Sequence, residues 1–173
     1  MFLRARTFLL AFLVMLALPI ASNGNTPNQR LAIAGIPDSA NVKNFLARLQ
    51  DAIKSSNANA VASMVHYPIK VFTKLGGVQI ERPNQLIQQF STIFDSNMRK
   101  AILCQKLDEL GATEYGVLIA NGAIYFNLVF QGESGEAARY ASNRLMSDEK
   151  LWKLQIIAIN DGLTVKDVAD NCR

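Results

Sequence analysis

The chain has 173 residues, a formal net charge of +4 and hydrophobic residues at 50% of its positions, which is enough for one domain with a substantial core. Its basic residues are scattered, and Arg99-Lys100 is the only adjacent pair. The sequence contains no basic stripe with interleaved aromatic residues, so its composition argues against nucleic-acid binding.

Residues 1–22 have the layout of a secretory signal peptide. Arg4 and Arg6 precede the apolar run FLLAFLVMLALPIA, and small or turn-forming residues follow it. This run is short for a membrane span of about 20 residues, so an N-terminal membrane anchor is the weaker alternative. We therefore expect a cleaved leader, a periplasmic or secreted protein, and no membrane association after cleavage. Because both arginines leave with the leader, the remaining chain carries a net charge of +2.

Two helices are predicted next in the chain. Residues 23–38 carry Asn, Thr, Pro and Gly around a short apolar segment, and we expect a flexible lead-in there. A single domain should then occupy residues 39–173. Its first helix is predicted over 40–55, where apolar residues recur at three- and four-residue spacing after Ser39 as the N-cap. A second, shorter helix begins after Asn57 and should end before Tyr67-Pro68, because the residue before a proline disfavours the α conformation.

The middle of the chain is predicted to continue with a short hairpin and two more helices. Residues 69–72 and 78–80 favour strands, and Leu75-Gly76-Gly77 favours the turn between them. Pro83 suits the first position of the following helix. After an interruption at Asp95-Ser96, one more short helix should end near Cys104. The Tyr67-Pro68 peptide bond is a candidate for the cis form at the turn into the strand, but trans is the default expectation, since most X-Pro bonds are trans.

The segment YGVLIANGAIYFNLVF, residues 115–130, is the clearest local signal. Asn121-Gly122 between two apolar runs is typical of a tight hairpin turn and sets a strand register. In this register Ile119 pairs with Ile124, Val117 with Phe126 and Tyr115 with Leu128, and all three pairs should face the core. Leu118 with Tyr125 and Gly116 with Asn127 should share the other face.

The C-terminal part should supply the last strand. Residues 131–150 are interpreted as a long connection with helical tendency around 137–145, and residues 151–159 as a strand with Trp152, Leu154 and Ile156 on one face. Helices therefore gather early and the main strands come late. This order predicts an α+β fold with helices on one face of an antiparallel sheet.

Cys104 and Cys172 are the only two cysteines. In an exported protein an even number favours a disulfide, which would tie the C-terminal tail to a helix in the middle of the chain. Two free thiols or a metal-binding pair are the alternatives. A nucleophilic cysteine is disfavoured because His66, the sole candidate base, belongs to a different element.

Three segments together resemble small exported bacterial proteins of the nuclear transport factor 2-like superfamily. They are FLARLQDAIKSSNANAVASMVHYPIKVF, the pair LIQQFSTIFDSNMRKAIL and YGVLIANGAIYF, and LWKLQIIAIND. The resemblance spans residues 42–161. It implies a cone-shaped, curved antiparallel sheet wrapped around N-terminal helices, often with an apolar pocket. Members of this superfamily are isomerases, dehydratases or plain binding and dimerisation modules, and the fold alone does not choose among them.

Candidate catalytic residues are sparse. The carboxylates lie at element ends, in turns or on polar faces, and none falls inside the apolar strands 115–130 or 151–159, where a general base of raised pKa would be needed. His66 with Tyr125 is the catalytic pair to consider, but His66 would need a group that fixes its tautomer. We prefer a structural role in which His66 caps the end of the second helix.

Binding remains the preferred interpretation. Tyr115, Tyr125, Asn127 and Trp152 could line the mouth of a pocket, although packing on the sheet with polar tips in water is the simpler alternative. The sequence has neither H-E-x-x-H nor C-x-x-C, so we expect no metal site and no cofactor. We expect a non-enzymatic periplasmic binding module, for a small apolar ligand in the cone or for a protein partner on the sheet, a homodimer included. An isomerase or dehydratase, or a periplasmic inhibitor or immunity protein, is the alternative.

Overall fold

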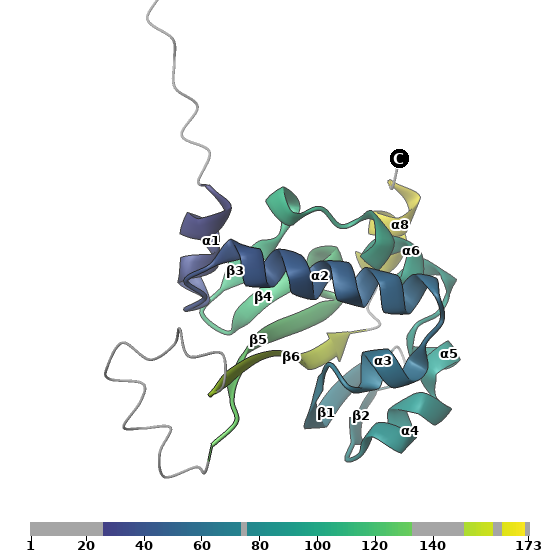
Figure 1. Ribbon diagram of the computed structural model, residues 1–173. Helices are drawn as coiled ribbons and strands as arrows, with labels where there is room; N and C mark the ends of the chain where they lie inside the picture. The colour runs from purple at the N-terminus through teal and green to yellow at the C-terminus, as the bar shows by residue number, and fades with distance from the viewer. Residues whose placement is uncertain (1–25, 74–75, 133–150, 161–163, 172–173) are drawn as a thin grey trace, which may run out of the picture.

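The computed structural model describes residues 26–73, 76–132, 151–160 and 164–171 (Figure 1). The leader predicted at residues 1–22 and the helical tendency predicted around 137–145 lie outside these residues. Within them the fold is α+β, as the sequence predicted, with a six-stranded sheet that does not close on itself.

The sheet is mixed rather than purely antiparallel. Its order is β2-β1-β6-β5-β4-β3, and β1 runs parallel to β6 while every other neighbouring pair is antiparallel. The predicted all-antiparallel sheet is therefore corrected at one position, the contact between the first strand and the last. The strands are β1 (Val65–Thr73), β2 (Gly76–Ile80), β3 (Gly111–Thr113), β4 (Gly116–Ile119), β5 (Ile124–Phe130) and β6 (Trp152–Asn160).

The longest helix, α2 (Ser39–Lys54), lies across one face of the sheet (Figure 1). Its apolar positions recur every three or four residues and are buried, as the periodicity predicted. Phe45 stacks on Phe126 of β5 with ring centroids 4.6 Å apart. The other helices are α1 (Pro27–Ile33), α3 (Ala58–Ala62), α4 (Pro83–Gln88), α5 (Phe90–Ile93), α6 (Ser96–Cys104) and α8 (Thr164–Asp170).

Residues 26–38 differ from the flexible lead-in that we expected. They contain α1, whose first turn is held by a capping box between Thr26 and Gln29, with Pro27 at the first helical position. Leu31 and Ile36 are each only 2% exposed. The segment is ordered because its few apolar side chains are buried in the same core as the rest of the domain.

The strand β1 begins at Val65, four residues before the predicted start. The chain is already hydrogen-bonded to β6 at this point, because the Ile156 amide donates a hydrogen bond of 2.8 Å to the Met64 carbonyl. Tyr67 donates its hydroxyl to the Ala62 carbonyl at 3.2 Å, and burial raises the pKa of Tyr67 to about 12, so this donor stays protonated. The Tyr67-Pro68 bond is cis, so the expected trans isomer is wrong.

The hairpin β4–β5 has the register that Asn121-Gly122 predicted. Ile119 pairs with Ile124, Val117 with Phe126 and Leu118 with Tyr125. Tyr115 is the exception, since it is 73% exposed rather than in the core. The reason is that residues 114–115 form the turn between β3 and β4, so Tyr115 lies in a turn and not in a strand.

Two glycines of this region allow a matched test. Gly116 has a φ of +143°, and a Cβ placed there would lie 2.7 Å from the Phe126 carbonyl oxygen. We expect Gly116→Ala to lower the free energy of unfolding by about 2–3 kcal/mol in urea denaturation, because the side chain brings both strain and a clash. Gly111→Ala is the control. Its Cβ would meet Leu118 at an ordinary 3.6 Å, and a loss as large as that of Gly116→Ala would contradict the argument.

The disulfide between Cys104 and Cys172 stays a prediction, since Cys172 lies outside the described residues. The fold supports it, because α6 ends at Cys104 and packs against α8, which ends at Asp170. We expect alkylation of the denatured chain to modify neither cysteine without reductant and both after reduction. Reduction should lower the free energy of unfolding by at most about 4 kcal/mol, the chain-entropy estimate for so long a loop. Alkylation without reductant would contradict the pairing.

Candidate functional site

A hollow of about 780 Å³ lies between α2 and the ends of strands β5 and β6. The segment leading into α2 closes one side of it. Because α2 presents residues three and four apart on one face, several of its side chains line the hollow together. The lining residues are Ile36, Pro37, Asp38, Asn41, Asn44, Phe45, Ala47, Arg48, Asp51, Leu128, Trp152, Lys153 and Leu154.

The hollow has an apolar wall and a polar rim. Leu128 of β5 and Leu154 of β6 form the sheet side of the wall, and they are opposite each other in the register of the two strands. The rim carries two carboxylates, Asp38 and Asp51, and two cations, Arg48 and Lys153, so its formal charge is balanced. A bound molecule would therefore contact apolar side chains of the strands and polar side chains at the rim.

Most of the rim is free to bind. Asp38 is occupied, because its Oδ1 accepts a hydrogen bond of 2.8 Å from the Ala40 amide at the start of α2. Among the contacts of the described residues, the side chains of Asn41, Asn44 and Arg48 have no hydrogen bond or ion pair. These groups can therefore form hydrogen bonds with a ligand without first breaking one within the protein.

Trp152 is the most informative side chain of the wall. Its ring packs against Phe130, with centroids 5.2 Å apart. Within the described part of the chain, its indole Nε1 is buried and has no hydrogen-bond partner. Leaving such a donor unpaired costs about 1–3 kcal/mol, so an acceptor that reached it would gain this energy.

The structure separates the four residues that the sequence suggested for ligand binding. Only Trp152 lines the hollow. Tyr125 and Asn127 alternate with Phe126 and Leu128 along β5, so they lie on the opposite face of the sheet. Asn127 donates its amide to the Tyr115 carbonyl at 3.3 Å. Tyr115 itself is exposed in the turn between β3 and β4.

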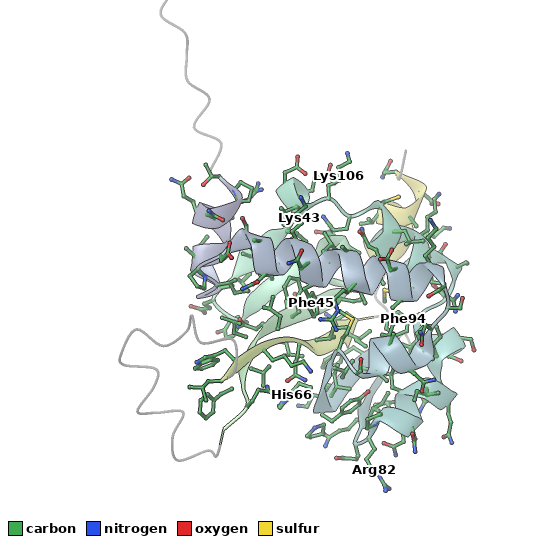
Figure 2. All side chains as sticks on the ribbon, in the orientation of Figure 1. Lys43, Phe45, His66, Arg82, Phe94 and Lys106 are labelled. Carbon is green, nitrogen blue, oxygen red and sulfur yellow. The ribbon has the colours of Figure 1, made fainter. Side chains whose placement is uncertain are left out.

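The predicted catalytic pair is not brought together. His66 is exposed in β1. Figure 2 shows it apart from α2 and from Phe45, which belongs to that helix. Tyr125 is in β5, and β6 lies between these two strands, which separates them by at least about 9 Å. The expected helix cap at His66 is also corrected, because the C-cap of α3 is Ser63 and His66 is already in the strand.

Sequence reasoning missed the rim of the hollow. The polar residues of α2 at the rim have the spacing of the solvent-facing side of an amphipathic helix, and a sequence pattern of this kind predicts only solvent exposure. These residues are Asn41, Asn44, Arg48 and Asp51. Only the position of α2 over the ends of β5 and β6 makes them part of a site. No signal in the sequence indicated this position.

Metal and membrane features are not found in the described residues. In the ranges 26–73, 76–132, 151–160 and 164–171, no three His, Cys, Asp or Glu side chains gather as a metal site requires. No helix within the same ranges is long and apolar enough to cross a membrane.

Comparisons with known proteins give no further guide, because no family model, curated protein or solved structure matches this chain. The resemblance to the nuclear transport factor 2-like superfamily therefore stays a prediction.

The position of His66 gives a direct test of its role. We expect His66→Gln to change the free energy of unfolding by less than about 0.5 kcal/mol, because the side chain is exposed and lies in a strand. The variant should also bind any ligand of the hollow as the wild type does. Loss of binding in a His66→Gln protein with an unchanged urea midpoint would show that His66 has a functional role.

Proposed function

We propose that this protein binds a small, largely apolar molecule with a hydrogen-bond acceptor in the hollow between α2 and the strands β5 and β6, without catalysing a reaction. The observation that carries the proposal is the hollow itself, at about 780 Å³, which is lined by Trp152, a residue whose buried indole N–H has no partner among the described residues. Pockets for small molecules usually measure about 300–1,000 Å³, with mostly apolar walls and a few polar groups.

The ligand chemistry follows from the two sides of the hollow. Leu128 and Leu154 are half-buried, so a bound apolar group would cover them further and gain about 25 cal/mol for each Å² of apolar surface removed from water. An acceptor on the same molecule would pair with Trp152 Nε1. Because this nitrogen is covered in the ligand-free protein, the indole must turn or its neighbours must move when the acceptor binds.

Binding is favoured over catalysis by the groups that line the hollow. Its carboxylates, Asp38 and Asp51, are both exposed on the rim. A general base for an apolar substrate needs a carboxylate whose pKa is raised by burial, or a histidine with a partner. Among the described lining residues, no carboxylate is buried and none of the residues is a histidine.

The same proposal includes export and the cone-shaped fold that the family resemblance implies. The basic and apolar layout of residues 1–22 supports a cleaved leader and a periplasmic location. The packing of α2 on one sheet face, with a hollow at the open ends of β5 and β6, supports a cone that binds a ligand.

The ligand can be sought by native mass spectrometry of the protein purified from the periplasm. A small mass that leaves on denaturation would identify a natural ligand. The direct test is a fluorescence titration, because Trp152 is the only tryptophan in the chain. Medium-chain fatty acids and their methyl esters are suitable probes, since both carry an acceptor and only the acids are charged. We expect saturable changes in the emission of Trp152.

A matched pair of variants tests the location of the site. Ala47 lines the hollow and Ala40 does not, although both are exposed on α2. We expect Ala47→Phe to weaken binding of the probe about 10-fold or more, a loss of about 1.4 kcal/mol, because the ring takes up space in the hollow that the probe would need. Ala40→Phe should bind within about 2-fold of wild type. Equal affinities for both variants, or no saturable response to any probe, would refute the proposal.

A further inference from the structure

The strand β2 forms one edge of the sheet and is open to solvent. It pairs with β1 on one side only, and four of its five residues are exposed, Ile80 being the exception. Helix α4 begins at Pro83 and contacts β2, but Gly76–Gln79 remain exposed. In the described residues, no backbone hydrogen bond joins β2 to any strand other than β1. Each outward N–H and C=O of this strand is therefore available to another strand.

This edge also lacks the usual protection against pairing. Native edge strands are commonly guarded by lysine, proline, a bulge or a covering element. The sequence of β2 is GGVQI, with no charge and no proline, and its register with β1 is continuous. The opposite edge differs, because β3 has only three residues and α1 packs against it. An unguarded edge in a folded protein suggests that something covers it.

Two exposed apolar side chains lie at this edge, one on each face of the sheet. Val78 is 47% exposed and pairs with Val71, whereas Phe72, also 47% exposed, pairs with Gly77. A Cβ placed on Gly77 would be 3.4 Å from two atoms of the Phe72 ring. The ring therefore lies over the bare glycine and reaches the edge. A strand added to β2 would cover both apolar groups.

We propose that the occupant of this edge is a second copy of this chain, paired through β2 in antiparallel orientation about a two-fold axis at Val78. The two six-stranded sheets would then form one continuous sheet. In this register Val78 is opposite Val78 of the second copy, and Gly77 is opposite Gln79. The Phe72 ring, lying over Gly77, contacts Gln79 of the second copy. Like residues meet only at Val78, and a symmetric apolar pair there is favourable.

A second copy fits this edge better than a different partner does. The segment Gly76–Ile80 carries no charge, so it offers nothing that would select an acidic or basic peptide. Self-pairing needs only main-chain hydrogen bonds and the Val78 pair. The sheet face of Leu118 and Tyr125 is a poorer candidate for a dimer because both side chains are half-buried.

The strength of this dimer should be modest. A strand of five residues gives a smaller interface than the roughly 1,200–2,000 Å² typical of stable complexes. The dimer should therefore dissociate on dilution, and its population should rise with protein concentration. Sedimentation velocity over a concentration series measures this directly. A wild-type protein that stays monomeric up to about 1 mM, where only very weak association would be missed, would overturn the proposal.

Charge swapping tests the register. Val78→Lys and Val78→Glu should each be monomeric at concentrations where the wild type is dimeric, because like charges then meet across the two-fold axis. An equimolar mixture of the two variants should regain the dimer. Tyr115→Lys is the matched control, since it adds the same charge at a residue that is 73% exposed elsewhere, and it should dimerise as the wild type does.

The outcomes separate the alternatives. Dimers of Val78→Lys would place the interface elsewhere and refute the proposal, and so would monomers in the mixture of the two charged variants. If either charged variant unfolds, the pairing is tested instead by amide hydrogen exchange of the wild-type protein at two concentrations. The amides of Gly77–Gln79 that point away from β1 should exchange about 10-fold or more slowly at high concentration than at low concentration. Equal exchange rates at both concentrations would overturn the pairing.

Discussion

The parallel pairing of β1 with β6 is the interaction on which the rest of the structure depends. It joins the N-terminal hairpin β1–β2 to the C-terminal strands β3–β6, which otherwise share no neighbouring strand. Val71 lies opposite Ile159, and both are at most 1% exposed. The buried amide of Gln155 donates to the Val65 carbonyl at 3.3 Å across the same contact. Without this pairing the strands would form two separate, smaller sheets.

The strand β6 pairs irregularly with both of its neighbours. The register of β6 shifts between its partners Tyr125 and Phe126 of β5, and the register of β1 with β6 also shifts between Val65 and Lys70. One extra residue in a strand reverses the alternation of its side chains beyond that point. Ile156 and Ile159 are therefore both buried, although they are three positions apart and would lie on opposite faces of a regular strand. The face that holds Ile156 also carries Leu154 and Trp152, which reach the hollow beside α2.

Local signals in the sequence were sufficient for the long helix α2 and for the hairpin β4–β5. The periodicity of α2 and the Asn121-Gly122 turn depend only on neighbouring residues, and both predictions are confirmed. The parallel β1–β6 contact was missed because it joins strands about half the chain apart, and a strand pattern does not specify its neighbour. Helix α1 was missed although its capping box could have indicated it. Of the predicted site residues, Trp152 alone lines the hollow, since strand alternation turns Tyr125 and Asn127 to the other face.

The hollow and the open edge have the same physical origin, because in both places the sheet extends beyond the elements that cover it. Along β5, Ile124 and Phe126 are fully buried beneath the helices, whereas Leu128 and Phe130 are only half-buried. Across the sheet, the exposed fraction rises in a similar way from 1% for Val71 in β1 to 47% for Val78 in the edge strand β2. Since β1 separates β2 from β6, a ligand beside Trp152 and a second copy at Val78 would occupy different parts of the sheet. Binding at one place therefore leaves the other accessible.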